Sequence, residues 1–130
     1  LFRSLRGLGE VYVISGKLGE AEKCYMELID MKCRLPHIYL NLAIVYHNQK
    51  KWDQEEQILK DLQKQYPEYY RCYMMFTYLY IAKEDEKPAG KRDYSSAIAS
   101  FEKAEEYAPE GSEDIESLRK VVEGLEQKKE

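Results

Sequence analysis

Apolar and small residues recur along the first 35 residues at the three- and four-residue spacing of amphipathic helices. Two such runs fall within residues 2–35, and Gly16, a residue typical of turns, lies between them. They carry Leu5, Leu8, Gly9 and Tyr12, followed by Ala21, Tyr25 and Leu28. The pattern predicts two helices that pack through these faces, with Leu8 turned inward and Gly9 allowing a close approach.

The same pattern returns 34 residues later, where residues 42–46 (LAIVY) match residues 8–12 (LGEVY). We therefore divide the chain into repeats of residues 2–35, 36–69 and 70–111. Ala43 and Ala97 are the small residues of the second and third repeats that, like Gly9, are expected to let helix axes approach closely. The second repeat ends at Pro67, a residue unsuited to a helix interior.

The third repeat is longer than the others because residues 83–92 interrupt its pattern. This segment is charged and contains both Pro88 and Gly90, which break helices. We expect a solvent-exposed, mobile loop at this point, followed by a helix that has Asp93 as its N-cap.

Residues 112–127 predict one more helix, apolar on one face and rich in Glu and Lys on the other. The apolar face carries Ile115, Leu118, Val121, Val122 and Leu125. Stacked helical repeats need such a capping helix, because the last repeat would otherwise leave an apolar face in water. The charged tail that ends in Glu130 is expected to fray.

The composition is that of a folded, helical chain, and it excludes two classes of partner. Of 130 residues, 44% are hydrophobic and 34% are charged, and the mean hydropathy is -0.67. No segment reaches the roughly 18 apolar residues of a membrane-spanning helix. The net charge is -4, so the chain lacks the excess of basic residues that binding to phosphates requires. From these two observations we expect neither a membrane nor a nucleic-acid partner.

The first residues and the cysteines favour part of a larger intracellular protein. Residues 1–6 contain neither an initiator Met nor the apolar core of a secretory signal, so we expect a fragment. Cys24, Cys33 and Cys72 are odd in number and lack CxxC spacing, which argues against a disulfide framework or a zinc site. Cys24 and Cys72 lie beside the aromatic positions of their helices and are expected to be packed or half-exposed, not catalytic. We expect a reducing, cytoplasmic location.

No group of residues predicts catalysis, a cofactor or a metal site. His37 and His47 lie ten residues apart on one predicted helix, about 15 Å of rise, and cannot bind the same ion. Acidic pairs such as residues 55–56 are expected on solvated outer faces. Residues 7–9, Gly-Leu-Gly, lack the third glycine and the preceding strand of a nucleotide site. We predict a protein that is not an enzyme.

The period and the order of residues resemble the tetratricopeptide repeat, a helix–turn–helix unit of 34 residues. Its signature is W-x2-L-G-x2-Y, then A-x3-F-x2-A, then P. Residues that match are Leu8, Gly9, Tyr12, Ala21 and Tyr25, then Leu42, Ala43, Tyr46 and Pro67, then Tyr80, Ala97, Phe101, Ala104 and Pro109. Glu55 and Thr77 depart from it. The resemblance covers residues 2–111 and implies an all-α, right-handed α-α superhelix of seven helices, one domain spanning residues 1–130.

In this family the first helix of each repeat lines a concave groove. The resemblance implies that the groove is lined here by Arg3, Arg6, Glu10, His37, Asn41, Ile44, His47, Asn48, Arg71, Met74, Met75 and Tyr78. Arginine, amide, aliphatic and Met side chains together suit an extended peptide that is acidic or presents its C-terminus. The resulting hypothesis is a protein–protein interaction scaffold, with self-association left open. Tyr78 is the tyrosine expected to be exposed.

One subfamily binds the C-terminal carboxylate of heat-shock chaperones through a five-residue clamp. Its positions correspond here to Arg6, Glu10, Asn41, Arg71 and Met75. Arg6 and Arg71 keep the basic character of the clamp, and Asn41 is the clamp's own residue. Glu10 replaces an Asn and Met75 replaces a basic residue. Because a carboxylate repels the expected anion, the sequence favours a different peptide.

A second interpretation is a regulatory or oligomerising C-terminal segment of a signalling protein. The long third repeat and the sequence Arg92-Asp93-Tyr94 resemble C-terminal regions of some bacterial serine/threonine kinases. A catalytic lobe upstream of residue 1 would support this interpretation, whereas further repeats would support a longer scaffold.

Overall fold

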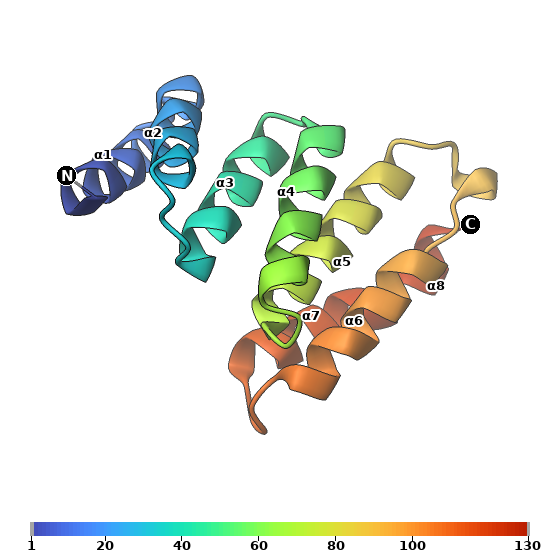
Figure 1. Cartoon of the computed structure of the whole chain (residues 1–130). Helices are drawn as coiled ribbons and strands as arrows, with labels where there is room; N and C mark the ends of the chain where they lie inside the picture. The colour runs from blue at the N-terminus through green and yellow to red at the C-terminus, as the bar shows by residue number, and fades with distance from the viewer. Residues whose placement is uncertain (1, 130) are drawn as a thin grey trace. The chain divides into compact units, whose positions relative to one another are not determined.

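The computed structural model describes residues 2–129, which form helices and connecting turns without a strand. Seven α-helices have 11 to 16 residues. In chain order the elements are α1 (Phe2–Ile14), α2 (Leu18–Asp30), α3 (Pro36–Asn48), α4 (Trp52–Gln65), α5 (Tyr70–Asp85), the 3-10 helix η1 (Ala89–Lys91), α6 (Ser95–Tyr107), α7 (Glu113–Glu123) and the four-residue α8 (Leu125–Lys128) (Figure 1). The predicted all-α helical-repeat fold is confirmed.

The helices form two compact units, each with its own buried core. Unit 1 extends to Tyr66 and contains α1–α4, and unit 2 begins at Pro67 and contains α5–α8. In unit 1, α2 packs on both α1 and α3, and α3 also packs on α4. In unit 2, α6 packs on both α5 and α7. No helix within residues 2–129 combines the length and the apolar character that a membrane span requires.

The core of unit 1 forms where α1, α2 and α3 face one another. Tyr25, Leu28, Ile38 and Val45 are almost completely buried there. Leu8 was predicted to share this core, but 43% of its surface is exposed. The three-residue spacing of Leu5 and Leu8 is compatible with either edge of the buried face, and α1 turns Leu5 toward the core.

The turn between the two helices of a repeat has the same left-handed backbone in both repeats of unit 1. Gly16, which the sequence marked as a turn residue, has φ of 77°, and Lys50, 34 residues later, has φ of 58°. Glycine adopts this conformation without strain, whereas a side chain such as that of Lys50 is crowded by its own backbone. The second repeat therefore makes the same turn with a less suitable residue.

Residues 83–92 were expected to form a loop, but α5 continues to Asp85, so residues 83–85 are helical. Lys and Glu are good helix formers, and Pro88, the first helix breaker, comes only later. The Arg92 guanidinium donates hydrogen bonds to the carbonyl oxygens of Asp85, Lys87 and Lys128 at 2.9–3.1 Å. The segment is thus tied to both α5 and α8 of unit 2.

Tyr94 occupies the centre of unit 2, beside Ile81, Ala97 and Leu125. Its hydroxyl donates a hydrogen bond to Oδ1 of Asp85 at 2.6 Å. Burial, together with this bond to a carboxylate, raises the pKa of Tyr94 to about 12. Asp93 was predicted as the N-cap of α6, but Tyr94 holds that position. Asp93 precedes it, and its Oδ1 accepts a hydrogen bond from the backbone N–H of Ser95 at 3.0 Å.

The capping segment is divided at Gly124 into α7 and α8. Ile115, Leu118 and Leu125 are buried as predicted, whereas Val121 is 43% exposed. Val121 and Val122 are adjacent on the helix, so their side chains differ in direction by about 100°, and the half-buried Val122 takes the inner position. Glu130, the last residue of the tail, lies outside the described residues.

Candidate functional site

Unit 1 contains a cavity of about 330 Å³ along its α1 and α3 helices. Its lining consists of Glu10, Val13 and Ile14 from α1, Tyr25 from α2, and Asn41 and Ile44 from α3. Glu10, Asn41 and Ile44 belong to the predicted groove, and the structure brings these three residues together. We call this cavity the unit 1 groove.

Tyr25 forms the floor of the unit 1 groove and is 1% exposed. Its ring lies against the backbone of Gly9, where the absence of a side chain leaves room for it. Burial and the nearby Glu10 carboxylate raise the pKa of Tyr25, and a hydrogen bond with the Asn41 side chain opposes that rise. The Tyr25 hydroxyl is therefore neutral, and its hydrogen bond helps to orient the side-chain amide of Asn41.

The charged residues of α1 are divided along the helix. Arg3 and Arg6 lie near its beginning, and Glu10 lies one turn further on at the groove. Nη1 of Arg6 is 3.4 Å from Nε2 of His37 on α3. Arg3 and Glu10 are exposed, whereas Arg6 and His37 are half-buried. This side of unit 1 is therefore positive at the beginning of α1 and negative beside Asn41.

His47 on α3 contacts the carboxylate of Glu55 on α4. Nδ1 of His47 lies 2.9 Å from Oε1 and 3.1 Å from Oε2 of Glu55, and the imidazole ring lies 5.1 Å from the ring of Trp52. Asn48, the next predicted groove residue, is exposed at the end of α3.

Glu55 was predicted on a solvated face, and this prediction is wrong, because its side chain is completely buried. It occupies the position that Ala21 holds in the first repeat and Ala97 in the third, and the hydrogen bonds from His47 offset part of its desolvation. Burial raises the pKa of Glu55, and the hydrogen bond and charge of His47 act in the opposite direction.

Three of the four predicted groove residues of unit 2 are accessible on α5. Arg71 and Tyr78 are exposed, Tyr78 by 37%, and Met75 is half-buried. Met74 was expected in the groove but is 9% exposed and belongs to the interior. Met74 and Met75 are adjacent, so a helix turns them in directions about 100° apart, and only Met75 faces outward.

The Arg71 side chain contacts a carboxylate of α7. Its Nη2 lies 3.9 Å from Oδ2 of Asp114, and its guanidinium is 5.6 Å from the centre of the Tyr70 ring. The Tyr70 hydroxyl donates a hydrogen bond to the same carboxylate oxygen at 2.9 Å. The nearby carboxylate weakens the attraction of Arg71 for an anion.

The three cysteines are buried and form no disulfide bond, so of the two expected environments for Cys24 and Cys72 the packed one is found. Burial raises the pKa of the Cys72 thiol to about 12, which leaves it protonated at neutral pH. Within residues 2–129, no three His, Cys, Asp or Glu side chains are arranged to hold a metal ion.

Sequence reasoning assigned Tyr25 to packing alone and missed its place on the groove floor. The signal was present, because Gly9 and Tyr25 both match the repeat signature and a glycine implies a close approach at that level. The burial of Glu55 had a weaker signal, namely its place at a position that is small in the other repeats.

The comparisons with known proteins agree on one fold. The family model described as tetratricopeptide repeat matches residues 3–32. The first tetratricopeptide repeat domain of Spaghetti (RPAP3), solved with the Hsp90 peptide SRMEEVD, is 23% identical with a TM-score of 0.74 and covers 95% of this chain and 92% of that chain. No curated protein matches the chain.

Two further solved domains are similar over nearly the whole chain. The first tetratricopeptide repeat domain of human RPAP3 is 24% identical with a TM-score of 0.76, covering 98% of this chain and 94% of that chain. The TPR2B domain of yeast Sti1, in a complex with pHsp70, is 18% identical with a TM-score of 0.75 and the same coverage. The chain thus has the fold of a tetratricopeptide repeat domain, and the resemblance seen in its sequence is confirmed.

Proposed function

We propose that this chain is a protein-interaction scaffold and that the unit 1 groove binds an extended segment of a partner protein. The observation that carries the proposal is the cavity of about 330 Å³ in which polar and apolar groups converge. Peptide grooves combine apolar walls for side chains with a few polar groups that fix the backbone. The unit 1 groove has both features.

Each wall of the unit 1 groove has a separate task in this proposal. Val13, Ile14 and Ile44 form an apolar surface for a partner side chain, and Ile14 is 87% exposed and available for contact. The Asn41 amide, supported by Tyr25, binds the peptide backbone, because one amide both donates and accepts a hydrogen bond.

The charges of α1 determine which peptides fit. Glu10 repels a carboxylate at Asn41, so the chaperone-type carboxylate clamp is incomplete in this chain. Arg3 and Arg6 attract acidic residues of the partner toward the beginning of α1. We therefore propose a peptide with an acidic residue at the arginine end and a neutral, apolar residue beside Glu10.

Unit 2 offers its own contact surface, which consists of Arg71, Met75 and Tyr78 on α5. Met and Tyr provide adaptable apolar contact area, and Arg71 supplies a charge that is moderated by Asp114. We propose this surface as a second place for partner contact, to be tested with its own variants.

The similar solved domains support a peptide partner. The Spaghetti (RPAP3) domain is bound to an Hsp90 peptide, and the yeast Sti1 domain is in a complex with pHsp70. The comparisons give no support to the interpretation as a bacterial kinase segment. We propose a binding role without catalysis, in a reducing compartment that suits three cysteines without a disulfide bond.

The proposal is tested by selecting peptides of about 12 residues from a random displayed library against the 130-residue chain. The strongest binder is then titrated into isotopically labelled protein, and backbone amide shifts are followed by NMR. We expect the largest shifts at residues 10–14 and 41–44, together with an acidic residue in the selected sequences. Shifts confined to the outer surface of α4 would contradict the proposal.

A further inference from the structure

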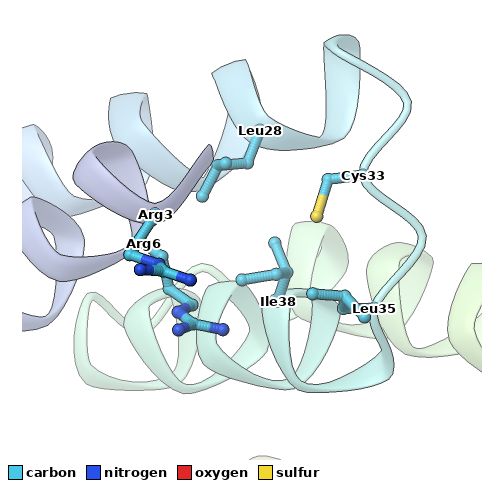
Figure 2. A pocket seen from close by; sticks show the side chains of 6 residues that line it. All are labelled: Arg3, Arg6, Leu28, Cys33, Leu35 and Ile38. Atoms are coloured by element: carbon cyan, nitrogen blue, oxygen red, sulfur yellow. The ribbon is translucent and has the colours of Figure 1, made fainter. Parts of the chain in front are cut away.

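A second cavity in unit 1 lies where α1 begins, α2 ends and the loop leads into α3. Its volume is about 190 Å³, and its lining consists of Arg3, Arg6, Leu28, Cys33, Leu35 and Ile38. Figure 2 shows the two arginine side chains along one side of this space, with Leu28, Cys33, Ile38 and Leu35 around the remainder. We call this cavity the Cys33 pocket.

The interior of the Cys33 pocket is apolar. Leu28 and Ile38 are completely buried, and Cys33, whose sulfur points into the space, is 6% exposed (Figure 2). Leu35 lies at the edge and is 47% exposed, which is unusual for a large aliphatic side chain beside a core. A ligand that covered Leu35 would remove apolar surface from water.

Two positive charges border this apolar space. Within the described part of the chain, neither Arg3 nor Arg6 forms an ion pair with a carboxylate, and the partner of Arg6 is His37. The guanidinium groups therefore remain available for an anion. The structure thus places an apolar recess beside two arginines without a compensating acid.

We infer that the Cys33 pocket receives one aliphatic side chain of a partner peptide, next to an acidic residue that binds Arg3 and Arg6. The inference rests on the proposed peptide-binding function and adds a second subsite to it. The volume is below the roughly 300–1,000 Å³ of sites for drug-sized ligands, so it suits a single side chain. Charge complementarity selects the acidic neighbour.

The Cys33 pocket differs from the unit 1 groove in place and in residues. The two cavities have no lining residue in common. Along α1, Arg6 and Val13 are separated by about 10 Å of helical rise, which an extended peptide spans with about three residues. A peptide that occupied both cavities would thus carry two apolar side chains about three residues apart.

The test uses the 130-residue chain with isotopically labelled Leu and Ile methyl groups and three short peptides capped at both ends. The first is acetyl-Gly-Leu-Glu-Gly-amide, the second has Gln in place of Glu, and the third has Ala in place of Leu. The capped ends remove any terminal carboxylate, so binding reports on the side chains alone. Methyl groups of Leu28, Leu35 and Ile38 report on the pocket, and those of Ile14 and Ile44 report on the groove.

We expect the Leu-Glu peptide to shift the signals of Leu28, Leu35 and Ile38. The Gln peptide should bind roughly two- to fivefold more weakly, as expected for partly exposed ion pairs. The Ala peptide should lose about fivefold or more, because the aliphatic contact is removed. In the Arg3→Gln/Arg6→Gln variant, the preference for Glu over Gln should disappear while the preference for Leu over Ala remains.

A matched control changes the same number of charges elsewhere. Lys23→Gln/Lys60→Gln alters two exposed residues that do not line the Cys33 pocket and should keep the preference for Glu. Equal affinity of wild type for the Glu and Gln peptides would overturn the inference. Shifts of the Ile14 and Ile44 methyl signals alone would also overturn the inference, but they would leave the proposed unit 1 groove intact. If the library-selected peptide fails to bind the unit 1 groove, that result contradicts the proposed function and not the Cys33 pocket.

Discussion

The ring of Tyr25 lies so close to Gly9 that a methyl group on that glycine would be only 2.9 Å from Cζ of the tyrosine. Real Cβ atoms do not approach a neighbour this closely. Tyr25 is almost completely buried in the core cluster that includes Leu28, so a shift of its ring away from Gly9 would disturb that packing. The position of α1 against α2, and with it the floor of the groove, depends on the missing side chain.

Gly9→Ala should destabilise unit 1 by up to about 2 kcal/mol, because overpacking the contact with Tyr25 costs about 1–3 kcal/mol and the helix propensity of alanine offsets only part of it. Gly7→Ala is the matched control on the same helix. An added Cβ at Gly7 has no neighbour within 4 Å, and alanine favours helix by about 0.5–1 kcal/mol over glycine. Urea denaturation should therefore give shifts of opposite sign, and equal shifts would show that the Gly9 contact does not constrain the fold.

Lys50→Gly should stabilise the chain by about 0.5–1 kcal/mol. The left-handed backbone at φ of 58° costs a non-glycine residue roughly 1–2 kcal/mol, and the greater freedom of glycine in the unfolded chain offsets part of that gain. Gly16→Ala, at the equivalent turn with open space around it, should destabilise by about 1–2 kcal/mol. A Lys50→Gly variant that melts below wild type would refute the strain argument.

Glu55→Gln should change how stability depends on pH. Burial raises the pKa of Glu55 above its ordinary value of 4.5 in the folded chain, with His47 opposing the shift. The folded state therefore binds this proton more tightly than the unfolded state, and the contribution to stability is lost as pH rises through the folded pKa. The neutral Gln side chain has no such dependence.

The check is urea denaturation of both proteins at several values from about pH 5 to about pH 8. The free energy of unfolding of wild type minus that of Glu55→Gln should fall as the pH rises. Comparison with the variant cancels the opposite trend from Glu84, whose pKa is lowered by its hydrogen bond from Lys87. A difference that does not fall as the pH rises would contradict the raised pKa of Glu55.

Glu10→Asn should increase the affinity for the peptide SRMEEVD, the Hsp90 peptide bound by the similar Spaghetti (RPAP3) domain. The substitution removes the carboxylate beside Asn41 that repels the acidic end of this peptide, and the expected gain is about two- to fivefold. Glu27→Gln, on the exposed surface of α2, makes the same change in net charge and should have little effect. Fluorescence anisotropy measures the affinity of wild type and both variants for this peptide. Equal gains in affinity for the two variants would show that only the net charge matters.

The helical repeats were predictable because the 34-residue period and the spacing of apolar residues follow directly from helix geometry. The spacing of apolar residues does not determine which edge of a helix's apolar face is covered by neighbouring helices. Leu8 and Val121 each carry an apolar side chain in register, yet each lies at an edge that the neighbouring helices leave open. Only the packed structure decides their burial.

Charged residues were the main source of error. Glu55 was assigned to the surface because isolated charges avoid burial, but His47 lies eight residues earlier and becomes its partner only when α3 and α4 pack. Residues 83–85 were assigned to a loop because they belong to a charged segment that contains Pro88 and Gly90, although their own helix propensity is high. Three residues that line the unit 1 groove were predicted from the sequence, namely Glu10, Asn41 and Ile44. The Cys33 pocket was not predicted, because it depends on a loop conformation that the sequence pattern does not encode.

The central claim is that the unit 1 groove binds a peptide, and the most direct measurement is calorimetric titration of the library-selected peptide into wild type and Asn41→Ala/Ile44→Ala. For wild type we predict micromolar affinity, about -7 to -8 kcal/mol. The double variant, confirmed as folded by circular dichroism, should bind about tenfold or more weakly, because a hydrogen bond and an apolar contact are both lost. Lys60→Ala, an exposed residue of α4, should bind like wild type. Equal affinity of the double variant and wild type would contradict the account.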